Sequence, residues 1–160
     1  MFLELNYSHP NFIKTKIRRY KSKFVLTYMS QDSDKYKKLK ELIDKKALAH
    51  LATIHGNSPH LIPLWIDFDG ENLLINTLIG TQKDKNMQKH STVAISIVDP
   101  ENPYSSVLIE GKAISREIEN AKEHYSKVSH HYTGSAYKGP KGDRVIYKIR
   151  PVKIIDVLRE

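Results

Sequence analysis

The sequence reads HLIPLWIDFDGENLLINT from residue 60 to residue 77. Two runs rich in β-forming residues, His60 to Phe68 and Asn72 to Thr77, flank the pair Asp69-Gly70. Aspartate and glycine readily adopt the positive φ angles of a tight hairpin, so the two runs are predicted to be antiparallel neighbours in one sheet. This stretch favours a fold built on hairpins.

Further β runs lie on both sides of this hairpin. Upstream, residues 47–54 form an expected strand that ends in the turn from His55 to Pro59. Downstream, strands are expected at residues 93–98, 107–114 and 144–157. Pro100 and Pro103 preclude regular pairing between the first two of these, and Pro151 is expected to interrupt the last.

Apolar residues at helical spacing separate some of these β runs. One predicted helix buries Tyr36, Leu39, Leu42 and Ile43, a second begins at Gln82, and a third buries Ile118, Ala121, Tyr125 and Val128. About six mostly antiparallel strands with three inserted helices predict a mainly β fold of the α+β class. Hairpin connections favour an antiparallel barrel over a doubly wound parallel sheet.

Charge divides the chain near residue 30. The net charge is +8, but residues 1–29 hold six basic residues against Glu4 alone. We interpret residues 1–29 as a basic N-terminal extension, which could be an ordered arm, an interaction tail or residues translated from an upstream start. Residues 30–160 are interpreted as the domain. Because most of the positive charge lies in the extension, the sequence disfavours nucleic acid as a partner.

Composition excludes several classes of site. The chain has no cysteine, which removes disulfides, thiolate metal sites and thiol nucleophiles. His130 and His131 are adjacent and diverge on a helix, so no metal site is predicted. No apolar run approaches the ~18 residues of a membrane span, and residues 1–5 are too short for the apolar part of a signal peptide. We therefore expect a cytoplasmic protein with no membrane contact.

The segment from Asn76 to Met87 carries the clearest binding signal. It runs from the end of a strand through Gly80 into a helix that bears Lys83 and Lys85. A phosphate near the start of such a helix gains both opposite charge and hydrogen bonds from free backbone amides.

The start of this helix is predicted from its capping pattern. Thr81 and Asp84 have the spacing of a capping box, which places the first helical residue at Gln82. A simpler interpretation is that the lysines form a solvated helix face and Thr81 is only a cap. Spacing alone favours this simpler interpretation.

Several motifs in a fixed order extend the signal. They are Leu51-Ala52-Thr53, Pro63-Leu64-Trp65, Gly80 with Lys83 and Asn86, Val98 to Tyr104, Glu110 to Ala113, Tyr132-Thr133-Gly134 and Arg144 to Pro151. Together they resemble the pyridoxamine 5'-phosphate oxidase-like superfamily, in particular its small FMN-binding and coenzyme F-420-dependent proteins. The resemblance covers residues 36–157. It implies a split β-barrel of the FMN-binding type for residues 30–160.

The resemblance also implies a site. A flavin-type cofactor, F-420 or FMN, would lie at a homodimer interface, with Tyr104 approaching from the second subunit. The implied cofactor-binding residues are His60, Ile62, Pro63 and Leu64 beside the ring, and Asn76, Thr77, Gln82, Lys83, Lys85 and Asn86 in the phosphate segment. Many relatives place arginines in this helix. Here Thr81 and Lys85 stand instead, and lysine offers a point charge rather than a bidentate fork.

The implied function is that of an oxidoreductase that transfers a hydride between the cofactor and a small organic substrate. The motif from Val98 to Tyr104 favours F-420 over FMN. Both cofactors stay open, because the same phosphate-binding residues would serve either one. The alternative is a non-catalytic flavin-binding or ligand-sequestering protein. No catalytic residue is predicted, because the carboxylates flanking the hairpin, Asp67, Asp69 and Glu71, are interpreted as turn residues. Trp65 is expected in the core.

Overall fold

The structure, a computed structural model, describes residues 34–158. Residues 35–158 belong to a compact unit that spans Lys35–Glu160. The predicted basic extension over residues 1–29 lies outside the described residues. Its boundary and its role stay predictions.

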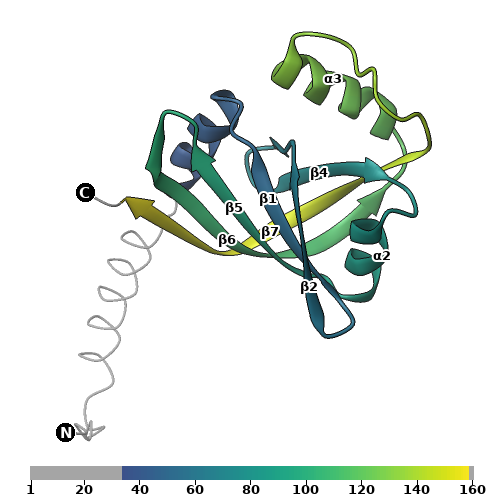
Figure 1. The fold of residues 1–160 in the computed structure, drawn as a ribbon, viewed down its shortest axis with the longest axis horizontal. Coiled ribbons are helices and arrows are strands. Elements are labelled where there is room, and N and C mark those ends of the chain that lie inside the picture. Colours follow the sequence, from purple (N-terminus) through teal and green to yellow (C-terminus); the bar gives the residue numbers. More distant parts are fainter. Residues whose placement is uncertain (1–33, 159–160) are drawn as a thin grey trace, which may run out of the picture. The chain divides into compact units, whose positions relative to one another are not determined.

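Seven strands form one antiparallel sheet in the order β2-β1-β5-β6-β7-β4-β3. Their bounds are β1 Ala49–His55, β2 Ser58–Leu64, β3 Asp67–Phe68, β4 Leu73–Leu78, β5 Thr92–Asp99, β6 Asn102–Glu117 and β7 Arg144–Leu158. Buried side chains of β1, β4, β5, β6 and β7 gather in one hydrophobic core, and the sheet curves around it (Figure 1). The predicted fold class, a mainly β split barrel with inserted helices, is confirmed.

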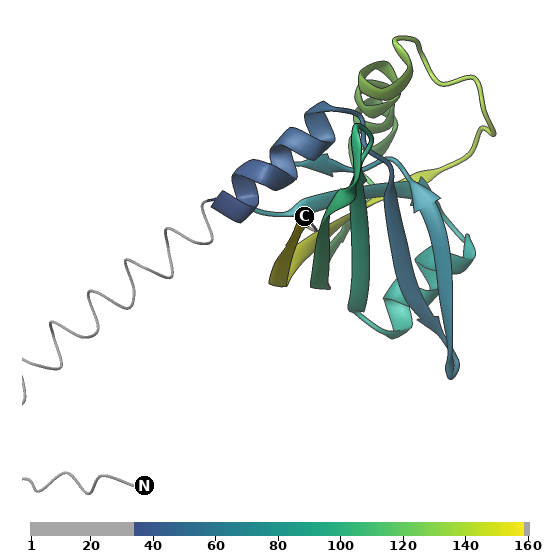
Figure 2. The same cartoon turned by 60° about the vertical axis from the view of Figure 1, so that its left-hand side comes forward.

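Three helices are inserted among the strands, over residues 34–44, in α2 (Gln82–Lys89) and in α3 (Ala121–Thr133). The first leads into β1 (Figure 2) and buries Leu39, Leu42 and Ile43, as its apolar spacing predicts. Ile118, predicted on the apolar face of the third helix, precedes that helix and is exposed. In both cartoon views, α2 and α3 lie on opposite sides of the end of β4.

The pairing of β4 with β7 positions the segments around these two helices. Leu78 lies opposite Arg144, and Asn76 lies opposite Ile146. The chain enters α2 soon after β4 ends, and it enters β7 from the loop that follows α3. The start of α2 and the loop after α3 therefore meet at the same edge of the barrel.

The predicted strand from His60 to Phe68 is divided, which raises the strand count from six to seven. β2 pairs with β1 at one edge of the sheet, and β3 pairs with β4 at the other, so the two predicted hairpin partners are only partly neighbours. At the break, the Ile66 amide donates to the Tyr132 hydroxyl over 3.3 Å. That hydroxyl lies 3.1 Å from the carbonyl oxygens of both Ala47 and Ile66. Because Tyr132 takes the place of a ladder partner, the strand can end there without an unsatisfied amide.

The Asp69-Gly70 turn itself is confirmed. Asp69 Oδ1 accepts hydrogen bonds from the amides of Glu71 and Asn72, over 3.0 Å and 2.7 Å. Gly70 has a φ of 101°, in the region that favours glycine. The turn joins β4 to the two-residue strand β3 rather than to one long strand.

Pro151 does not end the last strand as predicted, but the pairing of β7 is irregular beside it. Glu110 lies opposite Lys153 and Gly111 lies opposite Pro151, so Val152 is an extra residue in β7. β7 is continuous from Arg144 to Leu158, and the register shifts between Glu110 and Gly111, opposite Pro151. A Cβ at Gly111 would lie 2.7 Å from Ile149 Cγ2, so glycine lets β6 approach β7 closely beside this bulge. Around Pro100 and Pro103 regular pairing is broken, as predicted, by a register shift after Val98, although β6 already begins at Asn102.

Candidate functional site

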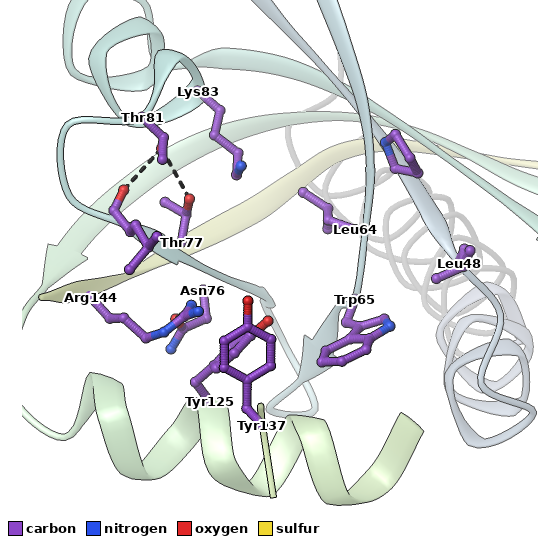
Figure 3. Close-up of a pocket in the computed structure, with 12 residues that line it drawn as sticks. Leu48, Leu64, Trp65, Asn76, Thr77, Thr81, Lys83, Tyr125, Tyr137 and Arg144 are labelled. Atoms are coloured by element: carbon purple, nitrogen blue, oxygen red, sulfur yellow. Dashed lines mark hydrogen bonds between the residues drawn. The ribbon is translucent and has the colours of Figure 1, made fainter. Parts of the chain in front are cut away.

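The main cavity opens where β2, β4, α2, α3 and the start of β7 meet (Figure 3). Its volume is about 410 Å³. Its lining residues are Leu48, Pro63, Leu64, Trp65, Asn76, Thr77, Leu78, Thr81, Lys83, Tyr125, Tyr137 and Arg144. The lining thus holds two basic side chains and no acidic one, which suits an anionic ligand.

The first turn of α2 faces this cavity without a side-chain cap. The helix starts at Gln82, as predicted, but Thr81 makes no capping hydrogen bond. Its hydroxyl donates to the Leu78 carbonyl over 2.9 Å, so at the 3.1 Å contact between the two hydroxyls Thr77 is the donor and Thr81 the acceptor. The predicted capping box is therefore wrong. Instead, the side chains of Thr81 and Asp84 hold the turn before the helix. No side chain in residues 34–158 accepts a hydrogen bond from the first-turn amides of α2.

Asp84, the other half of the predicted capping box, is a structural anchor. Its carboxylate accepts from the Gly80 amide over 2.7 Å, from the Tyr147 hydroxyl over 2.6 Å and from Arg116 Nε over 3.1 Å. Burial alone would raise the pKa of Asp84, but the hydrogen bonds from Arg116, Tyr147 and the Gly80 amide hold it below its usual range. Burial and the Asp84 carboxylate raise the pKa of Tyr147 to about 12. This network fixes α2 to β6 and β7.

Lys83 is the basic residue that α2 places in the cavity. Its ammonium group points into the cavity in Figure 3. Burial, and secondarily the positive charge of Arg144, lower the pKa of Lys83. No carboxylate of the described chain lies within ion-pair distance of it. A half-buried ammonium without a counter-ion favours an anion in this position.

Arg144, at the start of β7, is a second cation of the cavity, and the sequence analysis did not select it as a site residue. Its side chain is buried, with 7% exposure. Arg144 Nη1 donates to Asn76 Oδ1 over 3.0 Å, and its guanidinium carbon lies 3.2 Å from the centroid of the Tyr125 ring. In the sequence, Arg144 is one basic residue before an apolar strand. Only the β4 to β7 pairing reveals its position in the cavity.

A polar chain behind Arg144 fixes its orientation. Asn76 Nδ2 donates to the Ala121 carbonyl over 2.7 Å and lies 3.2 Å from His124 Nδ1. Because an amide nitrogen only donates, His124 Nδ1 is the acceptor, and the His124 proton lies on Nε2, 3.4 Å from Asp67 Oδ2. Burial would raise the pKa of Asp67, but hydrogen bonds from His124, Lys127 and the Phe68 amide hold it far below its usual range. Asp67, interpreted as a turn residue, thus supports the cavity instead.

Aromatic rings form one wall of the cavity. Trp65 stacks on Tyr125, with ring centroids 5.9 Å apart, and on Tyr132, at 5.5 Å. Tyr137 meets Tyr125 edge to face, at 4.6 Å. Trp65 is half-buried and lies outside the hydrophobic core cluster, so its predicted place in the core is wrong. We call Trp65, Tyr125 and Tyr137 the aromatic wall.

The main cavity gathers five of the predicted cofactor-binding residues: Pro63, Leu64, Asn76, Thr77 and Lys83. The residues that do not line it are His60, Ile62, Gln82, Lys85, Asn86 and Tyr104. Lys85 is exposed on α2, and Tyr104 is 65% exposed on β6. Asn86 is 2% exposed and donates to Thr53 Oγ1 over 2.9 Å. A residue's position in or outside the cavity does not establish a binding role, so the roles of all eleven residues stay predictions.

No helix within residues 34–158 is long and apolar enough to cross a membrane. No three metal-ligating side chains come together there either.

Comparison with known proteins gives a consistent family assignment. The family model described as "Pyridoxamine 5'-phosphate oxidase" matches residues 36–158. Among solved structures, an "F420 Reductase" shares 28% identity over 72% of this chain and 94% of its own, with a TM-score of 0.66. No curated protein matches the sequence.

Two more distant structures share the fold. General Stress Protein 26 from Bacillus anthracis is 18% identical, with a TM-score of 0.61, over 76% of this chain and 92% of its own. A FAD-binding protein from Mesorhizobium loti is 16% identical, with a TM-score of 0.53, over 73% of this chain and 87% of its own.

Proposed function

Because the chain belongs to the pyridoxamine 5'-phosphate oxidase family, we propose that its main cavity binds a flavin-type cofactor, F-420 or FMN, and that the protein is an oxidoreductase. The substrate is a small organic molecule that exchanges a hydride with the cofactor. The similarity to an F420 reductase supports this choice of cofactor class.

The observation that carries the proposal is the anion-binding end of the cavity. Lys83 projects into it beside the first turn of α2, whose amides have no side-chain cap among the described residues. The Thr77 and Thr81 hydroxyls already donate to Thr81 and to the Leu78 carbonyl, so the free donors are Lys83 and these amides. No carboxylate lines the cavity. These groups fit a cofactor phosphate, which needs a positive charge and several hydrogen-bond donors.

The remaining walls fit a planar ring. Pro63 and Leu64, at the end of β2, offer apolar surface, and the aromatic wall lies on the side of α3. The family resemblance implies that the ring lies beside residues 60–64 of β2. His60 Nδ1 is buried there and has no hydrogen-bond partner within residues 34–158, as expected for a group that meets a ligand.

A bound flavin-type cofactor supplies the redox chemistry, in which two electrons and one proton pass as a hydride and a second proton is exchanged with solvent. The residues of this chain would bind the cofactor and orient it. Lys83 and the first-turn amides of α2 would fix the phosphate end, while Leu64 and the aromatic wall would exclude water from the ring. Burial raises the pKa of the Tyr125 hydroxyl, so that group stays protonated at neutral pH and acts only as a donor or acceptor.

The proposal includes a homodimer that completes the site. Leu108 of β6 lies opposite Ile155 of β7, and both are exposed on the outer face of the barrel, as is Leu61 of β2. Exposed apolar side chains on a sheet face favour burial against a second copy. The exposed Tyr104 would then reach the partner's cofactor, and Lys85 and Gln82 would contact the phosphate from outside the main cavity.

Titration of the purified protein with FMN and with F-420 tests the proposal. Fluorescence of each cofactor should change with a micromolar or lower Kd for at least one of them, and no binding of either would overturn it. Steady-state assays with the reduced cofactor and quinone, nitro or enone acceptors test turnover. Tight binding without turnover would assign the chain to the alternative, a flavin-binding protein without catalysis.

A further inference from the structure

We propose that Arg144 is a second anion-binding point of the main cavity, which takes a carboxylate or phosphate group of a planar organic substrate. The inference rests on the proposed function, because Lys83 is there assigned to the cofactor. It adds the chemical class of the substrate.

The positive charge of Arg144 has no counter-ion within the described residues. A guanidinium has five N–H donors in a rigid fork, and Asn76 accepts one hydrogen bond from it. Within the described residues, no carboxylate lies at ion-pair distance from this 7%-exposed side chain. A buried cation without a counter-ion destabilises a fold unless a ligand supplies the negative charge. The fork matches a carboxylate or a phosphate in bidentate geometry.

The Arg144 guanidinium is held rigidly in place by its neighbours. The Tyr125 ring covers one face of the guanidinium, at 3.2 Å, and the Tyr137 ring lies 5.1 Å away. Asn76 is itself held by the Ala121 carbonyl and by His124. A group fixed by packing and by hydrogen bonds behind it is preorganised to receive a ligand.

Arg144 and Lys83 lie on different sides of the main cavity. Lys83 comes from α2, whereas Arg144 comes from β7 and lies beside α3 (Figure 3). A second cavity of about 470 Å³, lined also by Lys122 and Lys141, shares Arg144, Tyr125 and Tyr137 with the main cavity but does not include Lys83. Arg144 therefore lies on the boundary between the two cavities. A substrate can reach it from the side of α3 while a cofactor phosphate occupies the side of α2.

The aromatic wall defines the shape of the substrate. Tyr125 and Tyr137 both contact the Arg144 guanidinium, and Trp65 stacks on Tyr125. A ligand whose acidic group meets the guanidinium edge places its body against these rings. Aromatic rings favour flat, conjugated partners by offset stacking. The expected substrate is thus a planar acid.

Trp65 provides the measurement, because it is the only tryptophan of the chain. We would titrate benzoate and, separately, inorganic phosphate into the full-length protein and follow Trp65 fluorescence, with calorimetry for the FMN-loaded protein. The variants are Arg144→Gln, Arg144→Lys and Lys83→Ala. Arg150→Gln is the matched control, since it removes the same group from an exposed position on the same strand.

Benzoate should quench Trp65 in the wild type and in R150Q, with a Kd at least tenfold weaker in R144Q and unchanged in K83A. R144K should bind with intermediate affinity, and its melting temperature shows whether a loss in R144Q reflects unfolding. If phosphate, but not benzoate, shows this pattern, the result supports Arg144 as an anion-binding point and identifies the acidic group as a phosphate rather than a carboxylate. Equal binding by wild type and R144Q overturns the proposal, as does absence of binding of both probes to the wild type. Equal loss in K83A and R144Q overturns the separation into two anion points. The cofactor proposal is tested separately, by FMN and F-420 titrations of the wild type, and it fails if neither cofactor binds.

Discussion

The Tyr147 hydroxyl donates a 2.6 Å hydrogen bond to the buried carboxylate of Asp84, and this contact joins the last strand to the helix that carries Lys83. The same carboxylate holds the Gly80 amide at the entrance of that helix. The geometry of the end of the cavity that holds Lys83 therefore depends on a group that does not line the cavity.

We expect Asp84→Ala to lower the free energy of unfolding by about 1–3 kcal/mol, because the Gly80 amide loses its acceptor and Arg116 its counter-ion. As a hydrogen-bond donor, the Tyr147 hydroxyl keeps only its 3.2 Å contact with the backbone carbonyl of residue 84. Urea denaturation followed by circular dichroism measures the change. Asp44→Ala is the control, since Asp44 forms an exposed ion pair with Lys40, and it should change stability by less than about 0.5 kcal/mol. Equal effects of the two substitutions would contradict the anchoring role of Asp84.

Stability should fall on acidification through Asp67 and Asp84. The pKa of each carboxyl is lowered in the folded state, so each stabilises the fold above its unfolded pKa of about 4, and this stabilisation is lost as pH falls through the folded pKa. Denaturation at pH 6 and at pH 3 measures the loss. In Asp67→Asn the difference between the two pH values should shrink, and an unchanged difference would rule out this linkage.

Lys83→Ala should weaken FMN binding by roughly 10- to 100-fold, the value of a charge-assisted hydrogen bond of about 1.5–3 kcal/mol. Lys85→Ala removes the same charge from the exposed side of the same helix, and we expect a smaller effect. Fluorescence titration of both variants decides between them. A larger loss of FMN affinity in K85A than in K83A would show that the phosphate binds outside the main cavity.

Asn76→Asp should reduce the affinity for anions without removing a cation. The new carboxylate would lie where Asn76 Oδ1 now accepts from Arg144 at 3.0 Å, and it would pair with the guanidinium. Benzoate quenching of Trp65 should weaken several-fold, while Asn72→Asp, in the turn before β4, should leave it unchanged. Tighter benzoate binding in N76D would show that Arg144 does not face the anion.

Tyr132→Phe tests the division between β2 and β3. The hydroxyl bonds the Ile66 amide and lies near two carbonyl oxygens, so its loss should cost about 1–3 kcal/mol of stability. Hydrogen exchange at the Ile66 amide should accelerate. Tyr104→Phe, at an exposed position, is the control and should be neutral. Unchanged exchange in Y132F would mean that another group protects this amide.

The sequence predicts well what depends on local pattern. The apolar spacing of Leu39, Leu42 and Ile43, the Asp69-Gly70 turn and the start of α2 at Gln82 are all confirmed. The barrel follows from the number and length of β runs and from the family motifs.

What it misses depends on contacts between distant segments. The break at Ile66 is stabilised by Tyr132, and Arg144 enters the cavity through Asn76, a residue 68 positions away. Thr81 has the spacing of a cap, yet its hydroxyl bonds Leu78 and Thr77 instead. No short motif records the first two choices, because each is made by a tertiary partner, whereas Thr81 chooses between local partners within four residues.

The break between β2 and β3 also has a kinetic consequence. Two strands that are consecutive in the chain end at opposite edges of the sheet, so the walls of the cavity assemble only when distant pairings such as β4 with β7 have formed. Pairings of this kind are formed late and slowly. A ligand of the finished cavity therefore slows unfolding and leaves the folding rate unchanged, and it extends the lifetime of the native state more than it helps the chain to reach it.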